Sequence, residues 1–165
     1  MIAREDIDRI VPALRRTAQA LCAGPDAVAL GDEICRDAIR RTLRSQPPPP
    51  EQVRLEVWVT VILVDSAREA VTRRPSQVAF AAPDPAADGL RERVSMALAA
   101  LTHEEREALV VVSLARFSYI EAAAALGLNM AQLMQTLTHA RDRFAAALGQ
   151  RGRARRDPSH LRVVK

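Results

Sequence analysis

Apolar side chains recur every three to four residues through most of the chain, which is the spacing of one face of an α-helix. In the first run, these positions are Ile7, Ile10, Val11, Leu14 and Leu21. In the second run, they are Leu30, Ile34, Ile39 and Leu43. Gly24-Pro25-Asp26 ends the first run, and the four prolines at 47–50 end the second, because proline lacks the amide hydrogen that a helix interior needs. The pattern predicts two amphipathic helices.

Residues 51–73 carry a pattern that fits either a strand or a helix. Val57 to Val64 is rich in β-branched side chains, which favour a buried strand. The flanking segments, 51–56 and 65–70, have helical spacing, and a lone strand would have no partner to pair with. We therefore predict one long helix and keep the strand as the alternative.

The second half of the chain contains four further helical patterns, over residues 90–100, 103–115, 118–126 and 130–148. The predicted fold class is all-α, with two small helical domains joined by a Pro-rich linker. The predicted boundaries are 1–74 for the first domain, 75–89 for the linker, 90–149 for the second domain and 150–165 for a basic, disordered tail. The two domains are expected to be separate lobes on a loose hinge.

Two capping boxes mark helix starts in the second domain. Thr102 with Glu105, and Ser118 with Glu121, have the spacing at which each side chain can bond the other residue's backbone amide. The two starts are sixteen residues apart, so the helix between them must be short.

The segment that follows has the residues of a sharp corner between helices. Gly127 can adopt the positive φ of a tight helix exit, and Asn129 can cap the next helix. Leu133 and Leu137 are four residues apart and should face the core. A short helix, a glycine turn and a second helix predict a helix-turn-helix.

The positive charge of the chain is concentrated near its end. The formal net charge is +4, yet residues 151–165 contain six basic side chains and one acidic one. The other 150 residues carry 18 basic and 19 acidic side chains, so the predicted domains are close to neutral. A basic tail of this kind can attract phosphate groups without reading base sequence.

Composition and motifs exclude several classes of protein. Hydrophobic residues make up 48% of the chain, but its longest apolar run is far shorter than the roughly 20 residues that cross a bilayer. Charged residues at positions 4–8 argue against a signal peptide, so a cytoplasmic protein is predicted. Two cysteines and three scattered histidines suggest no metal site, and no catalytic or nucleotide-binding motif occurs. We expect no enzyme activity, cofactor, membrane association or small-molecule substrate.

The second domain resembles region 4 of the extracytoplasmic-function (ECF) sigma factors. The resemblance rests on Leu101–Leu109, Phe117–Ala123, Leu126-Gly127 and Ala140–Arg143. In that family, region 4 binds the −35 promoter element through the second helix of its helix-turn-helix. The resemblance implies a DNA-binding set made up of Gln132, Gln135, Thr136, Thr138, His139, Arg141 and Arg143.

The first domain resembles region 2 of the same family, which binds core RNA polymerase and opens the −10 element. The implied surface for polymerase or an anti-sigma factor comprises Asp32, Arg36, Ile39 and Arg40. Asp65 and Arg68 match the Asp-x-x-Arg of the family's promoter-melting helix, whereas Val61 stands where the family has asparagine. Trp58 lies inside an apolar run and is expected to pack in the core rather than stack on bases.

Three interpretations of function remain open. The first is a sigma-factor-like regulator of transcription that joins core RNA polymerase and promoter DNA, although Met134, Gln135 and Thr136 replace a triplet that is usually basic in the family. The alternative is a sigma mimic that sequesters an anti-sigma factor in a stress response. It is suggested by Ala13–Arg16 and Leu30-Gly31-Asp32, which look like the sigma-like half of PhyR-type regulators. The third is a helical adaptor that only retains the fold.

Overall fold

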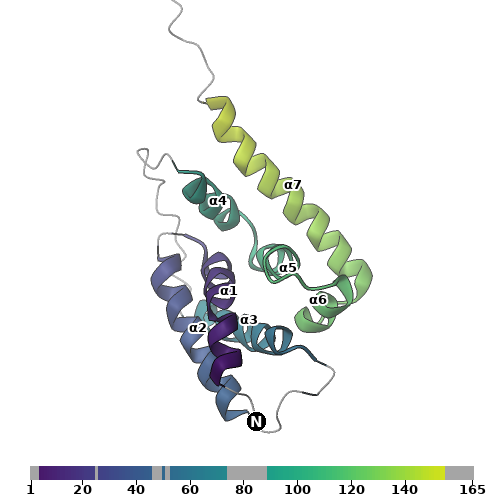
Figure 1. Cartoon of the computed structure of the whole chain (residues 1–165). Helices are drawn as coiled ribbons and strands as arrows, with labels where there is room; N and C mark the ends of the chain where they lie inside the picture. Colours follow the sequence, from purple (N-terminus) through teal and green to yellow (C-terminus); the bar gives the residue numbers. More distant parts are fainter. Residues whose placement is uncertain (1–3, 25, 46–49, 51–52, 74–88, 155–165) are drawn as a thin grey trace, which may run out of the picture.

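The computed structural model describes residues 4–24, 26–45, 50, 53–73 and 89–154. Within these ranges the chain forms seven α-helices and no strand, which confirms the all-α fold (Figure 1). The first three are α1 (Arg4–Cys22), α2 (Ala27–Arg44) and α3 (Leu55–Arg73). The other four are α4 (Leu90–Ala99), α5 (His103–Ser113), α6 (Tyr119–Leu126) and α7 (Met130–Ala154). We call α1–α3 the first lobe and α4–α7 the second lobe.

The first lobe packs its three helices around the apolar faces that the spacing predicts, except that Leu43, predicted on the apolar face of α2, is 58% exposed. Ile7, Leu14 and Leu21 of α1 are buried, and α1 contacts both α2 and α3. The helices α1 and α2 approach each other closely at Gly31, where a Cβ atom would lie 2.8 Å from the backbone of Gln19. That distance is shorter than van der Waals contact, so this approach requires glycine.

The ambiguous segment forms helix α3, so the predicted helix is confirmed and the strand alternative is wrong. Its buried residues are Val57, Val59, Thr60, Leu63, Val64, Ser66 and Ala67. This set covers more than one side of the helix because α3 contacts α1 and α2 and also α6 of the second lobe. A helix buried on several sides has apolar residues at consecutive positions, and its sequence therefore looks like a buried strand.

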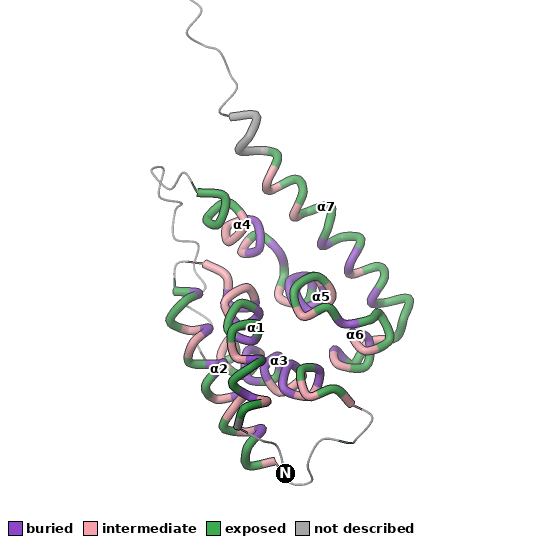
Figure 2. The backbone as a smooth tube through the Cα atoms, viewed as in Figure 1, coloured by how far each residue is buried: buried purple, intermediate pink, exposed green. Residues whose placement is uncertain are grey.

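In the second lobe, α7 packs against α4, α5 and α6. Leu133, Leu137 and Ala140 of α7 face this core and are 0% exposed, so the predicted inward leucine pair is confirmed. Most of the remaining surface of α7 is exposed (Figure 2). The helix continues to Ala154, inside the segment 150–165 that was predicted as tail. Residues 155–165 and, apart from Gly89, the predicted linker lie outside the described residues, and the domain boundaries stay predictions.

The two lobes pack against each other. Buried apolar residues from both lobes form one continuous cluster, with α1 in contact with α4 and α5 and α3 in contact with α6. Figure 1 shows α5 between the first lobe and α7. The expectation of separate lobes on a loose hinge is therefore wrong for this structure. Periodicity reveals that a helix has an apolar face, but it does not reveal which neighbour covers that face.

The described residues contain neither a candidate membrane span nor a candidate metal site. No helix in the described ranges is long and apolar enough to span a bilayer. These ranges also contain no group of three or more His, Cys, Asp or Glu residues that could hold a metal ion. Cys22 and Cys35 are buried free thiols, and burial raises the pKa of Cys22 to about 12. Cys22 is therefore protonated and unreactive at neutral pH.

Candidate nucleic-acid and partner interfaces

Capping boxes fix the starts of α5 and α6, as the sequence predicts. At α5, the Glu105 amide donates to Thr102 Oγ1 over 3.2 Å, and the Thr102 amide donates to Glu105 Oε2 over 3.0 Å. At α6, Ser118 and Glu121 form the same reciprocal pair, with distances of 3.3 and 2.8 Å. The hydrogen bonds from the Ser118 amide and hydroxyl hold the pKa of Glu121 below its usual range. Both helix starts are therefore set by residues three positions apart.

The corner between α6 and α7 is closed by backbone hydrogen bonds around Gly127. This residue has φ 69° and ψ 28°, the left-handed conformation that glycine adopts without strain. The Leu128 amide donates to the Ala123 carbonyl over 2.9 Å, and the Gly127 amide donates to the Ala124 carbonyl over 3.3 Å. These two bonds form a Schellman motif. The predicted helix-turn-helix corner is present.

A third reciprocal pair begins α7. The Gln132 amide donates to Asn129 Oδ1 over 2.9 Å, so the predicted cap by Asn129 is confirmed. In return, the Asn129 amide donates to Gln132 Oε1 over 3.0 Å. The side-chain oxygen of Gln132, which the resemblance assigns to DNA, is therefore engaged in the cap. The Asn-x-x-Gln spacing is the sequence signal that could have identified this role.

The remaining residues assigned to DNA lie along α7. Five of them are exposed: Gln135, Thr138, His139, Arg141 and Arg143. Thr136 is half-buried, and the Thr138 hydroxyl donates to the main-chain carbonyl of Met134 over 2.9 Å. The structure thus brings most of this set onto one exposed helix. Asp142 lies next to Arg141 in the sequence, so this part of α7 has little net charge.

Arg143 differs from the other residues of the set. Its Nη1 lies 3.3 Å from Glu105 Oε2, the same oxygen that accepts from Thr102 in the α5 cap. The Arg143 side chain is 58% exposed, so this ion pair contributes little to stability. The pair nevertheless directs the guanidinium toward α5. Arg141 is therefore the better placed of the two arginines to contact a ligand on the exposed side of α7.

The residues assigned to polymerase or an anti-sigma factor lie along α2. Asp32 accepts a hydrogen bond from Arg15 Nε over 3.1 Å, and a second Arg15 nitrogen contacts its other oxygen. The Arg15 guanidinium lowers the pKa of Asp32. Arg36 donates to the main-chain carbonyl of Asp32 over 3.1 Å. Asp32 is thus tied to α1, whereas Arg36 and Arg40 are exposed and Ile39 is half-buried against the core.

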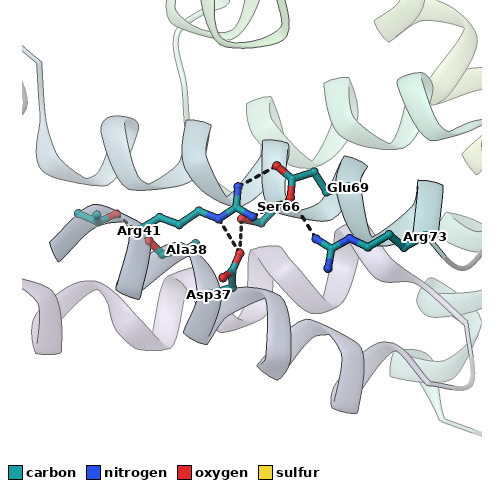
Figure 3. Close-up of polar contacts among 7 residues, drawn as sticks. Asp37, Ala38, Arg41, Ser66, Glu69 and Arg73 are labelled. Carbon is teal, nitrogen blue, oxygen red and sulfur yellow. Dashed lines mark hydrogen bonds and ion pairs between the residues drawn. The ribbon is translucent and has the colours of Figure 1, made fainter. Parts of the chain in front are cut away.

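A polar network beside this surface joins α2 to α3 (Figure 3). Arg41 donates to both carboxylate oxygens of Glu69, at 2.8 and 2.6 Å, and lies 2.7 Å from Asp37. The Ser66 hydroxyl donates to Asp37 over 3.1 Å, and Arg73 lies 3.0 Å from Glu69. The hydrogen bonds from Arg41 lower the pKa of Glu69 to about 2. Sequence reasoning missed this network, because its central pair joins two helices.

Arg106 of α5 connects the lobes through main-chain carbonyls. It donates to Leu98 over 2.8 Å and to Leu101 over 3.1 Å in the second lobe, and to Leu21 at the end of α1 over 3.1 Å. The residue is 5% exposed, and burial lowers its pKa. Carbonyls at a helix end lack partners within the helix and carry partial negative charge. Arg106 therefore satisfies the ends of both α1 and α4.

Glu107, the next residue, reaches the first lobe with its side chain. Arg68 Nε and Nη2 donate to its two oxygens over 2.8 and 2.7 Å, and His103 Nε2 lies 2.9 Å from Oε1. Burial acts to raise the pKa of Glu107, but the nearby His103 and the hydrogen bonds from Arg68 hold it below its usual range. A third contact joins Arg54, just before α3, to Glu121 of α6 over 3.1 Å. Sequence reasoning missed all three connections between the lobes.

The chain is similar in sequence and in fold to known proteins. No protein-family model matches the sequence. The chain is 28% identical over 155 residues to the ECF RNA polymerase sigma factor EcfG of Rhodopseudomonas palustris, and the match covers 88% of this chain and 84% of that protein. The chain is a homologue of the ECF sigma factors.

Two solved structures share the fold of this ECF sigma factor homologue. One is the sigma factor RpoE in complex with the anti-sigma factor NepR from Bartonella quintana, with a TM-score of 0.74 and 20% identity, over 88% of this chain and 96% of that one. The other is CnrH in complex with the cytosolic domain of CnrY, with a TM-score of 0.65 and 22% identity, over 87% of this chain and 85% of that one. At these identities the likeness concerns the fold.

Proposed function

We propose that this chain is a sigma-factor-like regulator of transcription that associates with RNA polymerase and promoter DNA. The observation that carries the proposal is the corner between α6 and α7, a helix-turn-helix whose second helix is exposed along one side, in a homologue of ECF sigma factors. Such a protein acts by binding, so the proposal assigns no catalytic residue. It also implies a cytoplasmic location, where polymerase and promoters are found.

In this proposal, α7 addresses DNA with its exposed side. Gln135 can form two hydrogen bonds with adenine in the major groove, and Thr138 and His139 can contact neighbouring base edges. Arg141 contacts a phosphate, and Arg143 would have to exchange Glu105 for one. Because this part of α7 offers few cations, the electrostatic share of its affinity is small. The chain therefore depends on polymerase to hold it at a promoter.

The first lobe addresses a protein partner through α2. Arg36 and Arg40 supply exposed positive charge, and Asp32 is fixed by its pair with Arg15. Two partners are proposed for this side, core RNA polymerase and an anti-sigma factor. The second is supported by the fold shared with RpoE, whose structure contains NepR. The matched relative is an RNA polymerase sigma factor, which favours a sigma factor over a sigma mimic.

The test uses core RNA polymerase from the source organism. The complex of this polymerase with the chain is used to enrich fragments of genomic DNA. We expect the chain to bind the polymerase and to retain specific fragments. Arg141→Ala should weaken that retention by about tenfold and lower its salt slope by about one, because one phosphate contact is lost. Arg91→Ala, an exposed arginine of α4, is the matched control and should change neither. Equal effects of the two variants would place α7 away from DNA.

A further inference from the structure

Three contacts between the lobes form what we call the interlobe clasp: Arg106 with Leu21, Glu107 with Arg68, and Glu121 with Arg54. Each contact involves a charged side chain, and the first two come from adjacent residues of α5. Glu107 is 2% exposed and Arg106 is 5% exposed, so both charged residues are buried where the lobes meet.

A contact made by buried charges has a high desolvation cost. Apolar residues of similar volume usually stabilise a contact as well or better, because charged groups must give up water. Permanent interfaces accordingly contain few charges in their centres. The clasp also differs from the interior of the second lobe, where α7 packs through Leu133, Leu137 and Ala140. Apolar residues of both lobes also pack together, but the charged side chains of the clasp suit a contact that can separate, since water can solvate each group after opening.

The clasp also occupies the side of α3 that faces the second lobe. Arg68 donates two hydrogen bonds to Glu107, and its side chain is 39% exposed. Arg54, just before the same helix, is paired with Glu121 at the start of α6. While these pairs persist, the second lobe covers this side of α3 and holds α7 at a fixed position relative to α2. A partner that contacts α3, or that needs another spacing of α2 and α7, must first break the pairs.

We infer that the interlobe clasp is an autoinhibitory contact, which keeps the lobes closed and lowers the affinity of the chain for polymerase and promoter DNA until it opens. The regulatory consequence rests on the proposed function, whereas the closing of the lobes does not. If only the open form binds, the apparent affinity is the affinity of the open form multiplied by the fraction of molecules that are open. Weakening the clasp should therefore tighten binding, which is the opposite of what damage to a binding surface would do.

The first test measures the distance between spin labels attached at Arg44→Cys on α2 and Ala145→Cys on α7, both exposed positions. Glu107→Gln removes the charge that pairs with Arg68 and should add a population with longer distances. Glu69→Gln is the matched control, because it removes an equivalent bidentate pair with Arg41 inside the first lobe (Figure 3). The control should keep the distances of the unchanged chain.

A second variant tests the clasp independently of any folding defect in Glu107→Gln. Arg54→Glu places a carboxylate against Glu121 at an exposed position, so it repels across the lobes without disturbing the core. We expect the same added population of longer distances. Unchanged distances in both variants, with helical content retained, would overturn the clasp.

The second test measures the affinity of each variant for core RNA polymerase. Glu107→Gln and Arg54→Glu should bind about tenfold more tightly if about one molecule in ten is open in the unchanged chain. Longer distances with unchanged or weaker binding would overturn the autoinhibitory role. If no form of the chain binds polymerase, the proposed function fails, and the distances alone still decide whether the clasp closes the lobes.

Discussion

The two lobes of this molecule are ordered by different kinds of contact. In the second lobe, α5, α6 and α7 each begin with a reciprocal pair of residues three positions apart. In the first lobe, the N-cap residue of α2, Asp26, makes no side-chain cap hydrogen bond. The helices of the first lobe are positioned instead by the close approach at Gly31 and by ion pairs between helices, such as Arg15 with Asp32. Pairs of neighbouring residues therefore fix the starts of α5, α6 and α7 in the second lobe, whereas contacts between distant residues position the helices of the first.

The largest change in the free energy of unfolding is expected from a substitution in the core of the second lobe. Leu137→Ala should lower the free energy of unfolding by about 3 kcal/mol, because Leu137 is fully buried and its removal leaves a cavity. Urea unfolding measures the change. Met134→Ala, one turn away and 39% exposed, is the control and should cost far less. Similar losses in the two variants would mean that α7 is not anchored by its inward leucines.

The packing of the first lobe is tested by adding one methyl group. Gly31→Ala should lower the free energy of unfolding by about 2 kcal/mol, because the new Cβ would overlap the backbone of Gln19. Gly149→Ala in α7 is the matched control, since a Cβ there meets nothing within 4 Å. That variant should be stabilised by up to about 1 kcal/mol, because alanine favours a helix. Stabilisation by both substitutions would refute the close approach of α1 and α2.

The contribution of a capping box to the stability of the second lobe is tested at the start of α6. Ser118→Ala removes the side chain that accepts from the Glu121 amide and should cost about 1 kcal/mol. Ser113→Ala, at the exposed end of α5, should change the free energy of unfolding much less. Thermal and urea unfolding of the pair measure the difference. A Ser118→Ala variant as stable as the unchanged chain would show that tertiary packing, rather than the cap, fixes this helix.

The smallest effect is expected from the surface ion pairs of the first lobe. Arg41 lowers the pKa of Glu69 from 4.5 to about 2. The stabilisation from this pair is therefore complete above about pH 4.5 and is lost as the pH falls toward about 2. Glu69→Gln should flatten the dependence of unfolding free energy on pH in that window relative to the unchanged chain. Identical pH profiles for the variant and the unchanged chain would show that the Arg41 pair does not stabilise the lobe.

The sequence predicted the parts of the fold that depend on neighbouring residues. Thr102 with Glu105, Ser118 with Glu121 and the Gly127 corner were all found where their spacing indicated. Helix α3 could be predicted only from the helical spacing of its flanking segments. Burial on several sides removes the three-to-four-residue spacing of apolar positions within the helix. The residues assigned to DNA on α7 came from the resemblance to the ECF sigma factors, which did not reveal the contacts that Gln132 and Arg143 make within the chain.

Contacts between distant parts of the chain could not be predicted from one sequence. Arg106 is 85 positions from Leu21, and Glu107 is 39 positions from Arg68. Nothing in the local pattern of α5 distinguishes these two charged residues from others on an exposed face. The packing of the lobes against each other was missed for this reason, because it depends on such pairs. The interlobe clasp is therefore visible only in three dimensions.

We propose that this ECF sigma factor homologue directs RNA polymerase to promoters through α7. Run-off transcription with core polymerase and the enriched genomic fragments tests it most directly. We predict discrete transcripts that require the chain, and a loss or change of these transcripts with Gln135→Ala but not with Arg91→Ala. A folded chain that yields no transcript above core polymerase alone, or a Gln135→Ala variant with unchanged transcripts, would contradict the claim.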